Sequence, residues 1–219
     1  MTSSGPPTQT GPTTGRSGRY ETTAGLVLVG WTFVAGLVVW LNPGPNVLDR
    51  WGFSALPHSP HSSFLLRIAD LGGLPLLLGG SALAALVVLG EDRRRAIACL
   101  GGPLIAAVLV EWVMKPLVGR RYLGVLCFPS GSVAVVAAVS TSWVLAVPRW
   151  LRWAAIVTGA GLVSLMSVAV IAVQWHYPTD ALAGASFGVG VVLLCDGLLH
   201  LQERHQTRPP VRGIRGLGI

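Results

Sequence analysis

Six long apolar stretches constrain this chain more than any other feature of its sequence. Each is close to the roughly twenty residues that a helix needs to cross a bilayer. They cover residues 24–41, 68–90, 96–114, 130–148, 153–174 and 181–200. The chain is 52% hydrophobic and only 11% charged, with a mean hydropathy of +0.62. This composition excludes a water-soluble domain and predicts an all-α, polytopic membrane protein with six transmembrane helices.

The predicted membrane domain covers residues 24–200, with a shorter segment on either side. Residues 1–23 are rich in Gly, Pro, Ser and Thr, so they are expected to form a disordered cytoplasmic segment. Residues 201–219 are expected to form a basic cytoplasmic tail that binds anionic headgroups. The first span follows Arg16 and Arg19 and so also resembles a signal peptide. A membrane anchor is favoured, because no small-residue cleavage site follows its apolar run.

The distribution of positive charge predicts the orientation of the spans. With the N-terminus inside, eleven of the sixteen Lys and Arg residues fall on the cytoplasmic side. The positive-inside rule therefore places both termini in the cytoplasm, and the plasma membrane is the expected location. The net charge of +7 is spread between apolar runs, which favours membrane lipids as partners and excludes nucleic acid. The outer side then receives loops 42–67, 115–129 and 175–180, where any chemistry is expected.

The outer loops carry residues suited to holding a phosphate. A helix that begins at Ser130-Gly131 directs its first N–H groups outward, at the positive end of the helix dipole. Lysine and arginine side chains nearby add full positive charges. The predicted phosphate-binding residues are Lys115, Arg120, Arg121, Ser130, Gly131 and Ser132. Taken singly, each also fits an ordinary helix end at a membrane surface, and Glu111 is interpreted as an i,i+4 partner for Lys115.

His176 and Asp180 are the predicted catalytic residues. They lie four residues apart, and Pro178 between them suits the first turn of a helix. The Asp180 carboxylate is expected to hold the imidazole in one tautomer, which leaves the other nitrogen free to attack. This arrangement is typical of phosphoryl transfer to histidine.

These segments resemble the three motifs of the type 2 phosphatidic acid phosphatase (PAP2) family, which are Lys-x6-Arg-Pro, Pro-Ser-Gly-His and Ser-Arg-x5-His-x3-Asp. The matching positions are Lys115, the run Pro129-Ser130-Gly131-Ser132, and the run Trp175-His176-Tyr-Pro-Thr-Asp180. The resemblance covers about residues 64–200. It implies a six-helix bundle of the family's kind, a nucleophilic His176 oriented by Asp180, and a phosphate held by Lys115, Ser130 and Gly131. It also implies that no metal or organic cofactor takes part.

Three positions depart from the family's pattern. Ser132 replaces the general-acid histidine, Val170 replaces the third motif's arginine, and Tyr122 replaces the first motif's arginine, with Arg120 and Arg121 slightly early. Losing a general acid costs roughly 10²–10⁴ in rate. The sequence therefore leaves two functions open, a lipid phosphatase or a catalytically impaired relative that binds lipid phosphate or scaffolds a membrane partner. A transporter is a third and weaker interpretation, and protein partners are unknown.

The missing acid also predicts a substrate preference. A lipid monophosphate must expel an alkoxide, whose conjugate acid has a pKa of about 16, near that of water. A diphosphate expels a phosphate, whose pKa is roughly 6. A polyprenyl or other lipid diphosphate is therefore the expected substrate. His58 and His61 are candidate replacements for the acid, although solvated loop histidines are the simpler interpretation.

Overall fold

The protein is built from helices and one very short hairpin. The structure, a computed structural model, describes residues 14–56 and 58–207, and the side chains of 18–56 and 58–202. Its elements are α1 (Thr14–Leu41), α2 (Val47–Ala55), α3 (Ser63–Leu71), η1 (Leu76–Gly80), α4 (Ser81–Val88), α5 (Arg93–Leu109), η2 (Val110–Met114), α6 (Lys115–Val118), β1 (Arg121–Tyr122), β2 (Val125–Leu126), α7 (Gly131–Ala146), η3 (Arg149–Leu151), α8 (Arg152–Ala172) and α9 (Pro178–Thr207). The predicted all-α class is confirmed.

Four helices are long and apolar enough to cross a membrane by themselves. They cover Gly18–Leu41, Arg93–Val118, Arg149–Ala172 and Pro178–Gln202. A fifth span arises if α3 and the η1–α4 helix count as one, although they are bent by 47° at the break between them. That break contains Gly72, Gly73 and Pro75, which interrupt the helix. The remaining predicted stretch, 130–148, forms α7, an apolar helix of only 16 residues. The described residues thus provide four or five spans by length and composition, rather than the predicted six.

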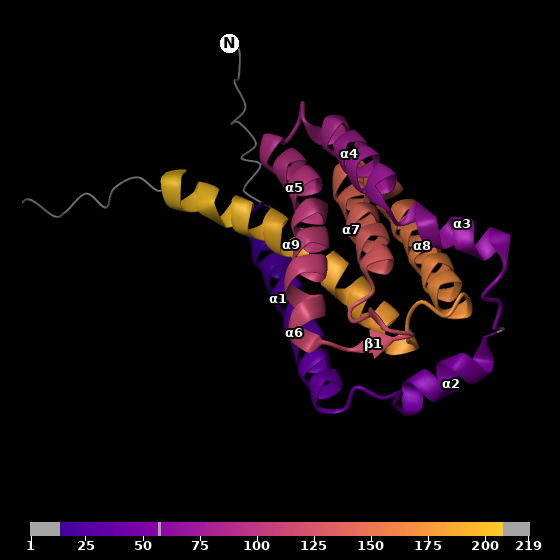
Figure 1. Ribbon diagram of the computed structural model, residues 1–219. Helices are drawn as coiled ribbons and strands as arrows, with labels where there is room; N and C mark the ends of the chain where they lie inside the picture. The colour runs from indigo at the N-terminus through magenta and orange to yellow at the C-terminus, as the bar shows by residue number, and fades with distance from the viewer. Residues whose placement is uncertain (1–13, 57, 208–219) are drawn as a thin grey trace, which may run out of the picture.

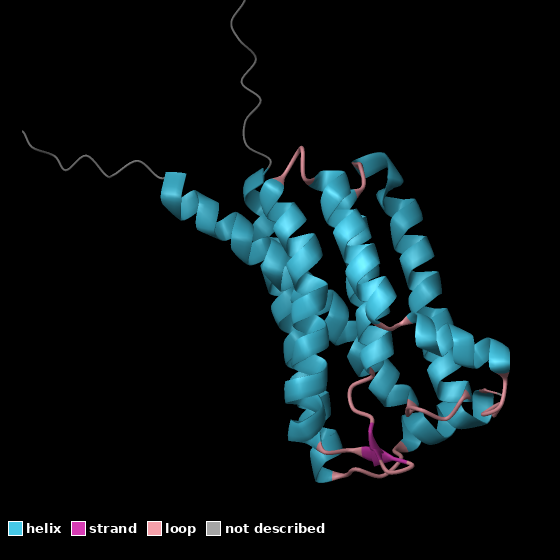
Figure 2. Ribbon diagram, turned by 45° about the horizontal axis from the view of Figure 1, so that its top comes forward, coloured by secondary structure: helices cyan, strands magenta, loops and turns pink. Residues whose placement is uncertain are grey.

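Helix α7 lies at the centre of the bundle. It packs against α9, α8, α5 and α4 (Figures 1 and 2). Most of its side chains are buried. Glycines on α9 allow the closest approach. A Cβ atom on Gly184 would collide with the Ser130 carbonyl, and one on Gly188 would collide with the Ala134 carbonyl. These small residues therefore serve close packing of the two helices.

The two ends of the bundle differ. The end shown at the bottom of Figure 1 carries α2, the β1–β2 hairpin and the start of α9. The other end carries the α4–α5 connection, the first turns of α1 and the last turns of α9. The predicted outer loops 42–67, 115–129 and 175–180 therefore meet at one end, because they connect the lower ends of the helices. Between described helices, the connections at the other end are short and include residues 149–151.

Helix α1 and helix α9 extend into the two predicted terminal segments. Helix α1 begins at Thr14, so the segment predicted to be disordered is helical over residues 14–23. Helix α9 continues to Thr207, well into the predicted basic tail. Residues 1–13 and 208–219 lie outside the described part of the chain. These helices extend past the apolar runs because turns of α1 and α9 pack on each other there, as the contact between Gly18 and His200 shows.

Candidate functional site

A buried arginine joins the loops that meet at the hairpin end. The Arg120 guanidinium contacts the Asp180 carboxylate at the start of α9, with 2.6 Å between Nη1 and Oδ1. Its Nη2 lies 2.6 Å from Oδ2 of Asp49 on α2. All three side chains have an exposed fraction of 0%. Asp49 also accepts hydrogen bonds from the backbone N–H and the hydroxyl of Thr179. The network thus connects α2, the hairpin and α9.

The remaining donors of Arg120 are also used within the protein. Nε donates to the Pro43 carbonyl, Nη2 to the Gly44 carbonyl and Nη1 to the Thr179 hydroxyl. An arginine has five N–H donors, and these five contacts account for all of them. Burial by itself would lower the pKa of Arg120, but the two carboxylates outweigh burial and raise it. Arg120 was predicted to bind phosphate, and in this arrangement its donors are instead occupied by the protein.

The imidazole of His176 is held by a backbone carbonyl. Its Nδ1 lies 2.8 Å from the carbonyl oxygen of Cys127. A carbonyl only accepts hydrogen bonds, so Nδ1 carries the proton and the neutral ring keeps its lone pair on Nε2. The backbone N–H groups of Trp175 and His176 both donate to the Val170 carbonyl, which fixes the turn after α8. The His176 side chain is 11% exposed, so the ring sits at the edge of the buried region.

Asp180 does not orient His176 as expected. Its Oδ2 lies 3.8 Å from His176 Nδ1, which is beyond hydrogen-bonding distance. That oxygen accepts a hydrogen bond from the Tyr177 N–H instead, while Oδ1 accepts one from the Arg120 guanidinium. The Asp180 backbone carbonyl accepts from the Ser130 N–H. Asp180 therefore fixes the turn that carries His176 and the entry to α7, and the Cys127 carbonyl holds the ring.

The N-terminus of α7 forms the second part of the site. Ser130 precedes the helix, is fully buried, and its hydroxyl oxygen has no hydrogen-bond partner among the described residues. The first N–H groups of a helix of this length also lack partners within the helix. An unpartnered buried hydroxyl at such a position is unusual and points to a polar ligand.

Lys115 lies beside this helix end. A Cβ atom on Gly131 would be 3.7 Å from Lys115 Nζ and would collide with Glu111 Oε1. The predicted i,i+4 pair of Glu111 and Lys115 is confirmed, with 2.7 and 2.9 Å between Nζ and the two carboxylate oxygens. Because Gly131 has no side chain, the Glu111 carboxylate can lie close to the start of α7. A phosphate bound there would have to compete with Glu111 for Lys115.

The other two predicted phosphate-binding residues lie apart from these contacts. Ser132 packs against Gly72 at the α3 break, where a Cβ on the glycine would lie 2.7 Å from the Ser132 Cβ. Within the described side chains it makes no hydrogen bond to Lys115 or His176. Arg121 is exposed on the hairpin and donates to the Gly124 carbonyl. The structure thus places the turn of His176 and Asp180 against Ser130, and Lys115 against Gly131.

An aromatic cluster covers the buried arginine, and the sequence did not predict it. The Tyr177 ring lies 3.8 Å from the Arg120 guanidinium and 4.6 Å from the Tyr122 ring centroid. Phe53 of α2 contacts both tyrosines. Tyr122, which replaces a family arginine, therefore packs on the ring that covers Arg120. The exposed His58 ring contacts Phe53, 5.8 Å between centroids, rather than His176.

Val170 is the third departure from the family's motifs. It is fully buried in an apolar cluster with Ile68, Met166 and Ala181. A charged side chain could not replace it there without a buried partner. Position 170 of α8 therefore supplies no positively charged side chain to the site.

Sequence analysis also missed Asp49, which balances the charge of Arg120. Asp49 has a detectable local signature, since Asn46 and Asp49 form a reciprocal capping box at the start of α2. That signature predicts a helix in loop 42–67 but not its partner in the hairpin.

The arrangement offers one imidazole nitrogen with no hydrogen-bond partner among the described residues, one amine group and one helix N-terminus at the same end of the bundle. Such a set can bind an oxyanion and attack it with nitrogen. Comparison of the chain with protein-family models, with curated proteins and with solved structures found no match.

Proposed function

We propose that this protein is an integral-membrane lipid phosphatase of the type 2 phosphatidic acid phosphatase kind, with His176 as its nucleophile. The observation that carries the proposal is the hydrogen bond between His176 Nδ1 and the Cys127 carbonyl. It leaves Nε2 as the basic nitrogen, with no hydrogen bond to any described residue. Ser130, Gly131 and Lys115 would hold the phosphate that Nε2 attacks.

The proposed reaction has two displacements at phosphorus. The Nε2 lone pair forms a bond to phosphorus, and the bond to the leaving oxygen breaks, with its electron pair moving to that oxygen. Water then attacks phosphorus, the bond between Nε2 and phosphorus breaks with its electron pair returning to Nε2, and a proton of the water passes to solvent, so that inorganic phosphate is released. The α7 N-terminus and Lys115 stabilise the negative charge on the phosphoryl oxygens in both steps. No metal or organic cofactor enters this proposal.

The preferred substrate in this proposal is a lipid diphosphate such as a polyprenyl diphosphate. Ser132 cannot protonate a leaving group as an imidazolium does, and His58 contacts Phe53 instead. A phosphate leaving group needs little protonation, since its pKa is roughly 6. An alkoxide leaving group, with a pKa of about 16, needs the acid.

An apolar groove beside the site supports a lipid substrate. A cavity of about 390 Å³ lies between α1 and the end of the helix that carries Lys115. It is lined by Phe33, Gly36, Leu37, Trp40, Met114, Leu117 and Val118. Since Lys115 directly follows Met114, an acyl or prenyl chain in this groove would have its head group near the ammonium.

The proposal includes six spans, with α3–α4 and α7 as the two beyond the four long helices. Helix α7 is about 24 Å long at 1.5 Å per residue. It can be shorter than the bilayer is thick, because it is surrounded by other helices rather than by lipid. Both termini would be cytoplasmic in the plasma membrane, with the hairpin end outside. The arginine distribution supports this orientation.

A second candidate function is binding without turnover, as a lipid-phosphate receptor or a scaffold for a membrane partner. Glu111 engages Lys115, and Arg120 is enclosed by carboxylates and carbonyls. Both contacts reduce the positive charge available to a transferring phosphoryl group. Loss of such a charge would slow the reaction by roughly 10²–10³.

The deciding experiment measures phosphate release by the detergent-purified protein. A polyprenyl diphosphate and a lipid monophosphate are supplied in parallel to the wild type, His176→Ala and Ser132→His. We expect release from the diphosphate, its loss in His176→Ala, and a rise in monophosphate activity in Ser132→His. Glu91→Gln, an exposed carboxylate at the other end of the bundle, is the control.

No release above the His176→Ala level from either substrate, combined with retained lipid binding, would replace the phosphatase with the second function. Equal rates on both substrates would refute the diphosphate preference.

A further inference from the structure

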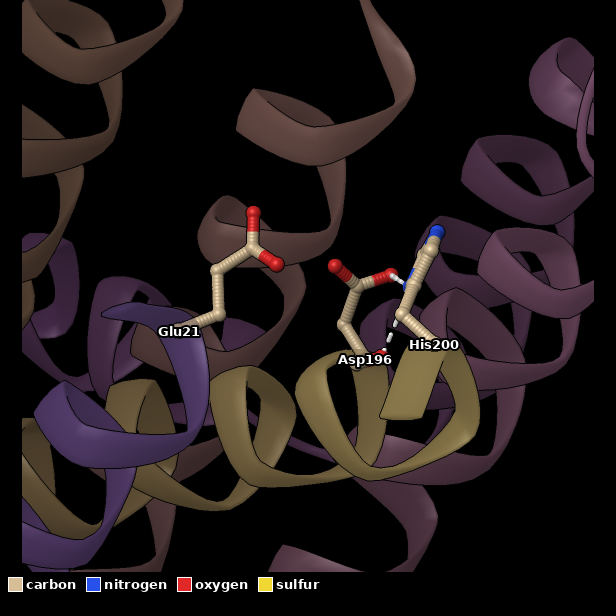
Figure 3. Close-up of side chains that lie close together, drawn as sticks. All are labelled: Glu21, Asp196 and His200. Carbon is tan, nitrogen blue, oxygen red and sulfur yellow. Dashed lines mark hydrogen bonds and ion pairs between the residues drawn. The ribbon is translucent and has the colours of Figure 1, made fainter. Parts of the chain in front are cut away.

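A second cluster of polar side chains lies at the end of the bundle opposite His176. It consists of Glu21 on α1 and of Asp196 and His200, one turn apart on α9 (Figure 3). One carboxylate oxygen or ring nitrogen from each residue lies within 4.8 Å of the others. The proposed phosphatase uses none of these residues.

Asp196 supplies an oxygen that points to a ligand. The residue is fully buried, and its Oδ1 lies 3.4 Å from Arg95 Nε. Its Oδ2 is also buried and has no hydrogen-bond partner in the described part of the chain. In Figure 3 the carboxylates of Glu21 and Asp196 face one another. A buried carboxylate oxygen costs free energy unless a cation or a donor satisfies it, and here another carboxylate lies next to it.

His200 is oriented by a third carboxylate. Its Nδ1 lies 2.8 Å from the Asp196 carbonyl oxygen and 3.6 Å from Asp196 Oδ1. Its Nε2 lies 3.2 Å from Oδ2 of Asp92, the residue that caps α5. In this arrangement Nε2 donates to Asp92 and Nδ1 donates to the Asp196 carbonyl. A cation that binds Nδ1 would therefore displace the Nδ1 proton, while Nε2 keeps its hydrogen bond to Asp92. Carboxylates commonly fix metal-binding histidines in this way.

We propose that Glu21, Asp196 and His200 bind one divalent transition-metal cation, with Asp92 as the residue that positions His200. Two carboxylates and an imidazole suit Mn²⁺ or Zn²⁺, whereas Ca²⁺ and Mg²⁺ prefer oxygen ligands alone. The cation joins α1 to α9 and, through Asp92, to the start of α5. It stabilises the packing of these helices at the end of the bundle that lacks the hairpin.

The test uses the full-length protein, freed of metal with a chelator and then titrated with Mn²⁺. Manganese is chosen because buried thiols compete for Zn²⁺ but bind Mn²⁺ weakly, and electron paramagnetic resonance counts the bound ion. We expect one Mn²⁺ per chain and a higher unfolding temperature when Mn²⁺ is present. Asp196→Asn and His200→Ala should lower the affinity at least tenfold, and Asp92→Asn by about 10–100-fold.

Glu91→Gln is the matched control, because this exposed carboxylate lies next to Asp92 in sequence. Its affinity should equal that of the wild type. If Asp196→Asn fails to fold, Glu21→Gln takes its place, since Glu21 is only partly buried. The proposal is overturned if the wild type shows no saturable Mn²⁺ binding, or if the ligand variants bind Mn²⁺ as the wild type does.

Discussion

Arg120 and Asp180 form a completely buried ion pair, with 2.6 Å between Nη1 and Oδ1, and the same guanidinium holds Asp49 at an equal distance. The pair links the hairpin to the start of α9, two residues beyond Pro178. It therefore positions the turn that carries His176 without touching the imidazole.

The first prediction concerns the stability that depends on Arg120. Replacing it with alanine leaves two buried carboxylates uncompensated, and breaking such a pair costs about 3–5 kcal/mol of unfolding free energy. Arg121→Ala is the control, because its side chain is exposed, and surface changes stay within about 0.5 kcal/mol. Denaturant unfolding in detergent measures both. Equal stability of the two variants would contradict the central role of Arg120.

The second prediction concerns the competition between Glu111 and phosphate for Lys115. Glu111→Gln removes the negative charge that now lies 2.7 Å from Nζ. Binding of inorganic phosphate should strengthen about tenfold, which equals 1.4 kcal/mol. Calorimetric titration tests this, with Glu91→Gln as a control at the other end of the bundle. The gain should disappear when Lys115→Ala is added, and a gain that persists would place the phosphate elsewhere.

The third prediction concerns the close contact of α9 with the entry to α7. In Gly184→Ala the added methyl collides with the Ser130 carbonyl. Overpacking of this kind costs about 1–3 kcal/mol and would displace Ser130 from Asp180. Gly161→Ala on α8 should instead gain about 0.5–1 kcal/mol, because no described atom lies within 4 Å of its added carbon. Similar changes in both variants would contradict this explanation.

The fourth prediction concerns the pH dependence of stability. Burial first, and then the nearby Asp180 charge, raise the pKa of the Cys127 thiol above its ordinary value of 9.0. The thiol stays protonated in the folded protein, whereas the unfolded chain loses this proton above about pH 9. Stability should therefore be unaffected below that pH and fall as the pH rises above it.

Thermal unfolding between pH 8 and pH 10 measures this effect. In Cys127→Ala the fall should be shallower, while the carbonyl that holds His176 remains in place. An identical slope in the wild type and the variant would refute the contribution of the thiol.

Several features of the fold could be predicted from the order of residues along the chain. All six apolar stretches are helical, because backbone groups within them have no partners in a lipid environment other than those of the same helix. The pair of Glu111 and Lys115 was predictable, because four residues make one helical turn. The bend after α3 follows from Gly72, Gly73 and Pro75, although the sequence analysis treated this stretch as one span.

The candidate site was predictable in its residue types but not in its contacts. The loops that carry Lys115, Ser130, Gly131, His176 and Asp180 lie at one end of the bundle, where the Asp180 carbonyl accepts a hydrogen bond from the Ser130 N–H. Arg120 was assigned to phosphate and is bound by Asp49, which lies 71 residues away in the chain. No local pattern could have indicated that pairing.

The sequence by itself determined the membrane class, the helical segments and the end of the bundle where the polar loops meet, because hydropathy, helix periodicity and connection order are properties of neighbouring residues. Only the tertiary structure decided which carboxylates neutralise Arg120, that the Cys127 carbonyl holds His176, and that Glu21 meets Asp196. The physical reason is that a buried charged side chain must pair with an opposite charge or a polar group that lies close to it in space. That partner is set by how α1, α2, α7 and α9 pack together.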